Sequence, residues 1–205
     1  FEKPEPRAMT LEHSWSEPAA WSHDSQVTPY WPYTPQRLIL LPDFTNKVNA
    51  AERYARPFSL PVFNKYLLLA AGEMEQGLES YRKAALAAPA AKQKGAFREV
   101  QLAEQIERMM RSDAAVLQFE DLRFRLAHTS GSAAQRPLIE QMTAILKEEL
   151  PRTEASYEAA RRDSRLGYEW EQDYIYTPSH IREKLRLLRR TLAEQIPAWR
   201  RAHGL

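Results

Sequence analysis

Apolar residues recur at steps of three and four along most of the chain after Pro61, and this spacing predicts amphipathic α-helices. A first helix is expected from Pro61 to about Ala87, because proline is tolerated in a first helical turn and Pro89 follows the end of the pattern. A second helix is expected from about Ala91 to Ala127. No alternating run of strand length follows Pro61, so the expected secondary structure is helical.

Each of these two helices has an apolar stripe that is expected to face the core. The stripe of the first helix comprises Val62, Phe63, Tyr66, Leu67, Ala70, Met74, Leu78 and Tyr81. The stripe of the second comprises Phe97, Val100, Ile106, Met110, Leu117 and Phe124.

Two further helices follow. The run 129–132, Thr-Ser-Gly-Ser, breaks the pattern and supplies a capping serine for a helix that begins near Ala133 and continues through Ala160. Pro151 is expected to kink or interrupt this helix, because proline has no backbone N–H to donate. The last helix begins after the cap at Thr177. Its apolar stripe comprises Ile181, Leu185, Leu188, Leu192, Ile196 and Trp199.

Short connections between long helices favour antiparallel neighbours. The sequence therefore predicts an all-α fold, an up-and-down bundle of three to four long helices over residues 61–205.

Residues 1–60 differ in composition from the predicted bundle. Nine of the 14 prolines lie within the first 61 residues, among many tryptophans and tyrosines and without any glycine. Proline disfavours long helices, and a flexible linker would be rich in glycine and poor in aromatic residues. We therefore expect an extended proline- and aromatic-rich arm whose side chains are covered by the bundle, or by a preceding domain of a longer polypeptide. Because the chain begins with Phe1 rather than Met, we expect it to be a processed product or an excised piece of something larger.

Composition and charge narrow the function classes. The 205 residues carry 29 basic and 27 acidic side chains, a balance that disfavours a nucleic-acid-binding protein. The apolar runs are too short for a membrane span. The absence of cysteine excludes disulfides and thiolate metal sites, and it leaves both a cytoplasmic and an exported location open.

Neither metal-binding nor cofactor-binding spacings occur. The five histidines form no pair at the i, i+4 spacing of a helical metal site, and the six glycines are too scattered for a phosphate loop. No metal and no cofactor are therefore expected. The basic residues near the C-terminus are interpreted as a solvated helix face, with contact to an anionic surface as the alternative. They are Arg182, Lys184, Arg186, Arg189, Arg190, Arg200 and Arg201.

The segment 161–177 concentrates unusual chemistry between two helices. Aromatic rings stack on the apolar faces of sugars, and carboxylates and guanidinium groups bind hydroxyls. The candidate ligand- or domain-contact residues are Asp163, Arg165, Tyr168, Glu169, Trp170, Glu171, Asp173, Tyr174 and Tyr176. The alternative is that these residues only anchor the loop, and no catalytic residue is assigned. Arg165 is expected to pair with Asp163 or Glu169, and Gly167 to allow a positive-φ turn.

Two stretches resemble a known group of proteins. They are residues 117–126, LQFEDLRFRL, and 163–169, DSRLGYE. These stretches resemble the C-terminal helical region of large bacterial proteins with a glycosidase-type barrel of the α-glucuronidase and β-N-acetylhexosaminidase kind. The resemblance spans about residues 58–199. It implies a helical region that follows such a barrel, packs on it and lends residues to the rim of a sugar site.

Two functional hypotheses follow. The first is a non-catalytic accessory helical domain of a carbohydrate-active, glycoside hydrolase-like protein, whose partners would be the preceding catalytic domain or another subunit and an oligosaccharide. The second is a helical scaffold, dimerisation or protein-binding module with no sugar role. Whether the parent protein is an enzyme stays open at this point.

Overall fold

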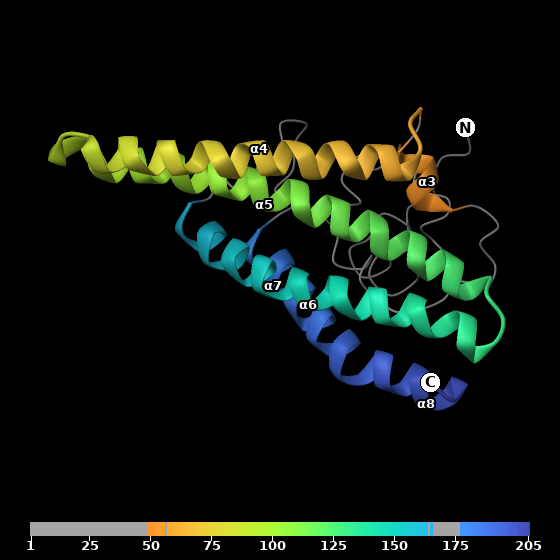
Figure 1. Cartoon of the computed structure of the whole chain (residues 1–205). Helices are drawn as coiled ribbons and strands as arrows, with labels where there is room; N and C mark the ends of the chain where they lie inside the picture. The colour runs from red at the N-terminus through yellow and green to blue at the C-terminus, as the bar shows by residue number, and fades with distance from the viewer. Residues whose placement is uncertain (1–48, 56, 164, 166–176) are drawn as a thin grey trace, which may run out of the picture.

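The computed structural model describes residues 49–55, 57–163, 165 and 177–205, and every regular element among them is helical. The elements are α3 (Ala50–Ala55), α4 (Leu60–Ala87), α5 (Ala90–Ala127), α6 (Ser132–Arg162), α7 (Pro178–Arg190), the π-helical turn η6 (Thr191–Gln195) and α8 (Ile196–His203). Successive long helices run antiparallel and pack against their neighbours in sequence (Figure 1). The predicted all-α up-and-down bundle is confirmed.

Most of the predicted arm, residues 1–48, lies outside the described residues. Its described end is helical rather than extended, because α3 occupies Ala50–Ala55. The Asn49 side chain accepts a hydrogen bond from the N–H of Ala51 at 3.1 Å and donates one to Asp121 of α5 at 2.7 Å. Glu52 accepts from the N–H of Leu60 at 3.4 Å, at the start of α4. This short helix is therefore attached to both helices that it touches.

The main hydrophobic core lies where α3, the first turn of α4, the second half of α5, the first half of α6 and the C-terminal helices meet. Its largest buried members include Leu117, Phe119, Leu126, Met142 and Leu146. A small second cluster joins Ala160 of α6 to Ile181 of α7. The core is thus concentrated at one end of the long α4–α5 pair.

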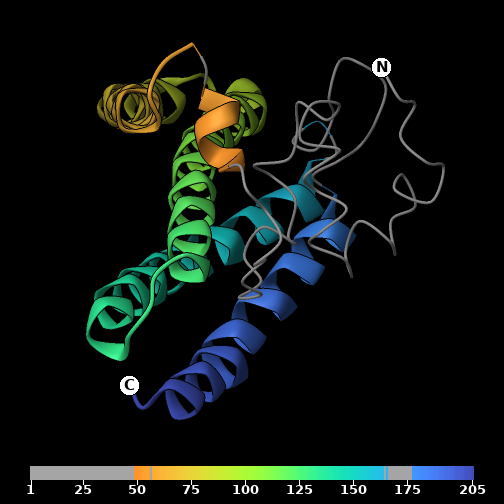
Figure 2. The same ribbon diagram turned by 90° about the vertical axis from the view of Figure 1, so that its right-hand side faces the viewer.

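The other end of that pair projects as a hairpin beyond α6 (Figure 1). α4 lies on the side of α5 that faces away from α7 and α8 (Figure 2). The buried residues of α4 follow a seven-residue repeat, Asn64, Ala71, Leu78 and Ala85. The predicted core stripe of this helix is therefore partly wrong: Leu78 is buried, but Val62, Tyr66 and Tyr81 are exposed.

The C-terminal helices confirm the predicted cap and stripe. The Thr177 hydroxyl accepts a hydrogen bond from the N–H of His180, and Ile181, Leu185, Leu188 and Ile196 are buried. Leu192 and Trp199 are half-buried against the core. The backbone hydrogen-bond pattern of the helix widens to a π turn just before Pro197, where the N–H of Ile196 donates to the carbonyl of Thr191. Since proline crowds the carbonyl four residues earlier and donates no hydrogen bond, the π turn accommodates it.

The α5–α6 corner differs from the prediction in its cap. The N-cap position of α6 is Gly131, with φ of 90°, and no serine side chain caps the helix. A hydrogen bond from Gln135 Nε2 to the carbonyl of Thr129, at 2.8 Å, holds the corner instead. Farther along, α6 continues through Pro151 without interruption, so of the two predicted effects of this proline only a kink stays a prediction.

Candidate interaction surfaces

The structure describes two of the nine candidate contact residues, Asp163 and Arg165. The other seven fall outside the described residues, so their predicted role stays a prediction. They are Tyr168, Glu169, Trp170, Glu171, Asp173, Tyr174 and Tyr176. The same holds for the proposed turn at Gly167.

Asp163 and Arg165 form a clasp at the C-terminal end of α6. The guanidinium of Arg165 donates to both carboxylate oxygens of Asp163, with Nη2 to Oδ2 at 2.7 Å and Nε to Oδ1 at 3.1 Å. Arg165 also donates to Glu99 of α5 at 3.0 Å, and Arg98 of α5 reaches Asp163 at 3.4 Å. The predicted pairing of Arg165 with Asp163 is confirmed. The clasp ties the end of α6 to α5.

Electrostatics favour the charged form of both clasp residues. The Asp163 side chain is only 3% exposed. Hydrogen bonds from Arg165 lower the pKa of Asp163 to about 2 against the opposing effect of burial. Hydrogen bonds to Asp163 and then Glu99 raise the pKa of the Arg165 guanidinium. Such a charge-assisted, two-pronged pair fixes geometry better than a single contact does.

We expect Asp163→Asn to destabilise the protein by about 1–3 kcal/mol at pH 7, since it removes a charged acceptor from a buried position. The folded-state pKa of Asp163 lies below its unfolded value. Its stabilising effect is therefore complete above about pH 4 and disappears as the pH falls through about 2. Urea unfolding at several pH values tests this. A gap between parent and variant that stays constant from pH 6 to pH 2 would contradict it.

A second polar cluster lies inside the bundle, where three helices meet. Lys184 of α7 donates to Glu149 of α6 and to the hydroxyl of Ser112 of α5, each at 2.6 Å. The Ser112 hydroxyl also bonds to Glu149, and Thr153 Oγ1 donates to the same carboxylate at 3.3 Å. Arg152 pairs with the second carboxylate oxygen. We call Ser112, Glu149 and Lys184 the buried triad.

The surroundings of the buried triad decide what it can do. A serine hydroxyl bonded to a lysine amine resembles a nucleophile beside its base. Lys184 is only 1% exposed, however, and Ser112 and Glu149 are equally enclosed. Burial alone would raise the pKa of Glu149, but the charges of Lys184 and Arg152 and the hydrogen bonds to it lower that pKa overall. The triad is therefore an ion pair that joins three helices, enclosed on all sides.

Sequence reasoning missed the triad and placed Lys184 on a solvated basic face, which is wrong. The position of Lys184 in the sequence indicates that it is buried. Lys184 follows Ile181 by three residues and precedes Leu188 by four, so it lies within the apolar stripe of its own helix. A lysine at such a position is buried only when a carboxylate meets it.

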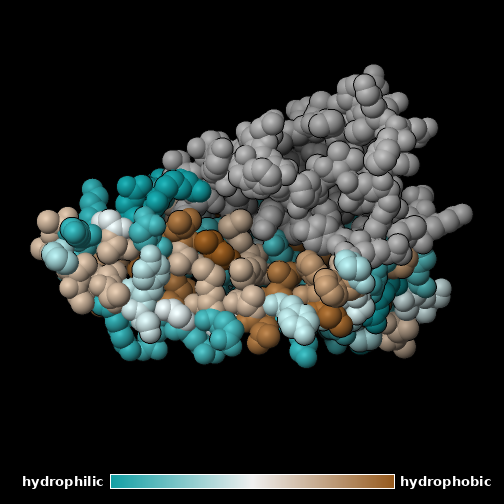
Figure 3. Space-filling model, turned by 90° about the horizontal axis from the view of Figure 1, so that it is seen from above, coloured by the Kyte–Doolittle hydropathy of each residue, from teal (hydrophilic) through white to brown (hydrophobic). Residues whose placement is uncertain are grey.

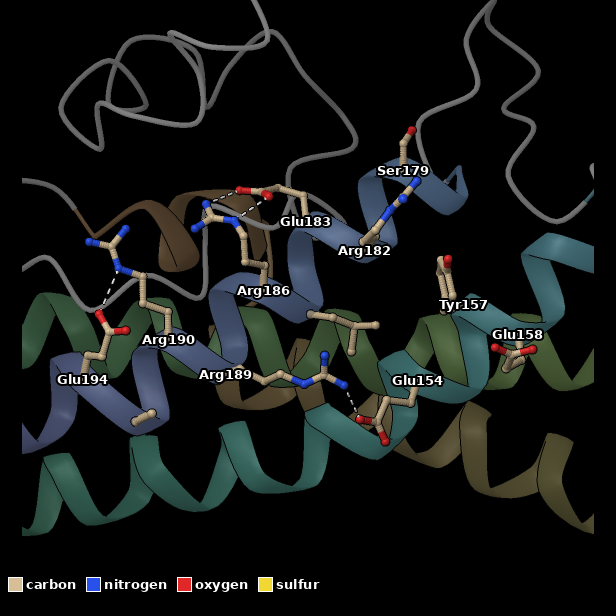
Figure 4. Close-up of a pocket in the computed structure, with 12 residues that line it drawn as sticks. Glu154, Tyr157, Glu158, Ser179, Arg182, Glu183, Arg186, Arg189, Arg190 and Glu194 are labelled. Carbon is tan, nitrogen blue, oxygen red and sulfur yellow. Dashed lines mark hydrogen bonds and ion pairs between the residues drawn. The ribbon is translucent and has the colours of Figure 1, made fainter.

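The remaining arginines of α7 border an open groove between α6 and α7 with a volume of about 1120 Å³ (Figure 4). The groove is lined by four arginines and four glutamates. Arg189 pairs with Glu154 at 2.8 Å, Arg190 with Glu194 at 3.4 Å, and Arg186 with Glu183 through two hydrogen bonds. These pairs balance the charge of the groove, which favours the solvated-face interpretation over an anion site.

The α4–α5 hairpin exposes an apolar surface. All nine large hydrophobic residues that are exposed in the described part of the chain lie between residues 58 and 106. They are Phe58, Val62, Tyr66, Leu68, Leu69, Tyr81, Leu86, Phe97 and Ile106. Seen from above, brown and tan side chains run along α4 between hydrophilic flanks (Figure 3). The α6–α8 half contributes none of them.

Ion pairs hold α4 onto α5 while this surface stays open. Arg82 of α4 binds Glu104 of α5 at 2.7 Å, and Glu75 binds Arg111 at the same distance. The side of α4 that faces α5 is thus occupied by the buried repeat and these ion pairs. The opposite side, which we call the outer face of α4, has no helix packed on it among the described residues.

Comparison of the chain with protein-family models, with curated proteins and with solved structures finds no match. Among the described residues, each helix is either too short or too polar to cross a bilayer. No cluster of three or more histidine, aspartate or glutamate side chains that could hold a metal ion occurs in this part of the chain.

Proposed function

We propose that the chain is a helical interaction module that binds another polypeptide through the outer face of α4. The observation that supports this is the uneven distribution of exposed large hydrophobic residues. All nine lie on the hairpin and on the turn that precedes it, whereas the remainder of the described bundle keeps its large hydrophobic residues covered. Six of the nine lie on α4, and exposed apolar side chains gathered in this way are typical of protein-binding sites.

The shape of the surface indicates the kind of partner. Tyr66 is 62% exposed and Leu69 is 53% exposed, and both lie on α4, which runs nearly straight (Figure 1). A straight apolar ridge is complementary to another helix, because side chains of one helix pack into the grooves of the next. The partner is therefore an amphipathic helix that covers the outer face of α4 lengthwise.

The accessory role in a carbohydrate-active protein is a separate proposal. It rests on the aromatic and acidic residues 168–176, which the structure does not describe. The described feature that supports it is the clasp, since Asp163 and Arg165 fix the C-terminal end of α6 against α5. An interaction module and an accessory domain are compatible roles.

Site-specific photocrosslinking tests the proposed function. Replacing Tyr66 by a benzophenone amino acid places the reactive group on the outer face, and the same replacement at Glu158 on α6 serves as the control. We expect an adduct at position 66 in the cell of origin, joined to a peptide with the apolar spacing of a helix. We further expect Leu69→Glu to abolish this adduct.

Leu86→Glu is the matched control for Leu69→Glu. Leu86 lies on the same helix and is 64% exposed, but it does not lie on the outer face. An adduct that survives Leu86→Glu and disappears with Leu69→Glu supports the proposal. The proposal is refuted if the adduct at position 66 does not exceed the level found at position 158. It is also refuted if the adduct forms equally well in the Leu69→Glu variant.

A further inference from the structure

We propose that the helix that covers the outer face of α4 is α4 of a second copy of this chain, packed antiparallel. This inference rests on the proposed function and names the partner. It follows from the order of large, small and polar residues along the outer face.

The outer face follows from helix geometry. An α-helix advances by about 100° per residue, so residues at steps of three and four share one side. The buried repeat of Asn64, Ala71, Leu78 and Ala85 marks the side against α5. Val62, Tyr66 and Leu69 lie about half a turn away from that line, and all three are exposed. The same steps continue through Glu73 and Gln76 to Ala87, with every position on them exposed.

Side-chain size changes halfway along the outer face. Its first half carries the large residues Val62, Tyr66 and Leu69. Apart from Lys83, its second half is small, with Gly77, Ser80, Ala84 and Ala87. No atom lies within 4 Å of the position that a Cβ on Gly77 would take, so a second backbone can approach closely there. The large side chains of the first half can therefore pack over the small residues of the second half of another such helix.

Only the antiparallel arrangement matches these halves in a pair of identical helices. When the two-fold axis passes between residues 74 and 75, Leu69 of one copy faces Ser80 of the other. In the same register Val62 faces Ala87, and Tyr66 faces Lys83 with Ala84 as the next residue along that helix. A parallel pair would instead place large residues against large ones and leave the small half unfilled.

The polar residues at the centre agree with the same register. Glu73 of one copy faces Gln76 of the other, so the amide of each Gln76 can donate to a carboxylate across the axis. Lys83, which faces Tyr66 in this register, pairs with Glu79 of its own helix at 2.7 Å and adds no unbalanced charge. Each copy thus supplies both members of every pair, as a two-fold interface requires.

The length of the contact sets its strength. Residues 62–87 of an α-helix span roughly 37 Å, and a single helix pair of that length lies at the small end of specific interfaces. We therefore expect a dissociation constant in the micromolar range, that is, on the order of 10⁻⁶ to 10⁻⁴ M. Sedimentation of the full chain over that range should show reversible dimerisation, abolished by Leu69→Glu and retained with Leu86→Glu.

The absence of cysteine from the chain makes the register directly testable. Leu69→Cys and Ser80→Cys variants are prepared separately, mixed and oxidised. The antiparallel dimer predicts a disulfide between the two different variants in several-fold excess over either variant joined to itself. Leu86→Cys, mixed with Leu69→Cys, serves as the control and should give only the background level.

Each outcome decides one proposal. If Leu69→Cys joins to itself in preference, the pairing is parallel and the inference is refuted. If the full chain stays monomeric at 1 mM and no mixed disulfide exceeds the control, the second copy is refuted as the partner. The proposed function then still stands if the benzophenone at position 66 captures a different helix in a manner that depends on Leu69, and it fails if nothing is captured.

Discussion

Lys184→Met should destabilise the protein by about 3–5 kcal/mol at pH 7, one of the largest effects of any single substitution in the described chain. Methionine preserves the apolar stem of the side chain, so little packing is lost. The loss arises because the carboxylate of Glu149 stays buried without its nearest positive partner, and because the Ser112 hydroxyl loses a donor. Urea unfolding followed by circular dichroism measures the change.

The double variant Lys184→Met/Glu149→Leu is the control that separates charge from packing. Replacing both ends of a buried ion pair by apolar residues is often close to neutral, so the double variant should be more stable than Lys184→Met alone. A double variant that loses the sum of the two single effects would contradict the pairing.

The pH dependence of the buried triad has a definite sign. The pKa of Glu149 is lowered in the folded parent, so its contribution is present above about pH 4.5 and is lost as the pH falls. In Lys184→Met the buried carboxylate instead gains a raised pKa, and acid then stabilises the variant relative to neutral pH. The gap between parent and variant should therefore close between pH 7 and pH 4.

Leu188→Ala should cost about 2–5 kcal/mol, because it empties a fully buried position in the main core. Leu188 lies on α7, where its side chain meets the cluster formed by α5 and α6. Leu192→Ala is the matched control, since Leu192 contacts the same core but is only partly buried, and it should cost clearly less. A loss below about 0.5 kcal/mol for Leu188→Ala would show that α7 does not pack as described.

The helices could be predicted from the sequence because their signals are local. Proline at the start of α4, the threonine cap before α7 and the stripe from Ile181 to Trp199 each act within a few residues. The predicted limits of the long helices therefore agree with the observed ones to within a residue or two. The cap of α6 was mispredicted because serine and glycine both suit that position, and tertiary contacts at the corner decide between them.

The faces of the helices could be predicted only in part. Periodicity identifies an apolar side, but α4 has apolar residues on two sides, and small residues such as Ala71 and Ala85 take the side against α5. The large residues Tyr66 and Leu69 then remain exposed. The buried triad could not be predicted because its members are 35–72 residues apart in sequence. Of the predicted loop chemistry, the Asp163–Arg165 contact was predictable since its partners are two residues apart.

The projecting end of the α4–α5 hairpin affects how cooperatively the bundle unfolds. Beyond Leu78 its buried apolar side chains are only Ala85 and Val100, so the tip can open without disturbing the main core. Backbone amides near Pro89 would then exchange their protons with water through local opening, at a free energy well below that of global unfolding. Amides of α5 around Phe119 exchange only when the whole bundle unfolds. A helix bound along the outer face would also slow this local opening, and the tip amides would thereby report occupancy of that face.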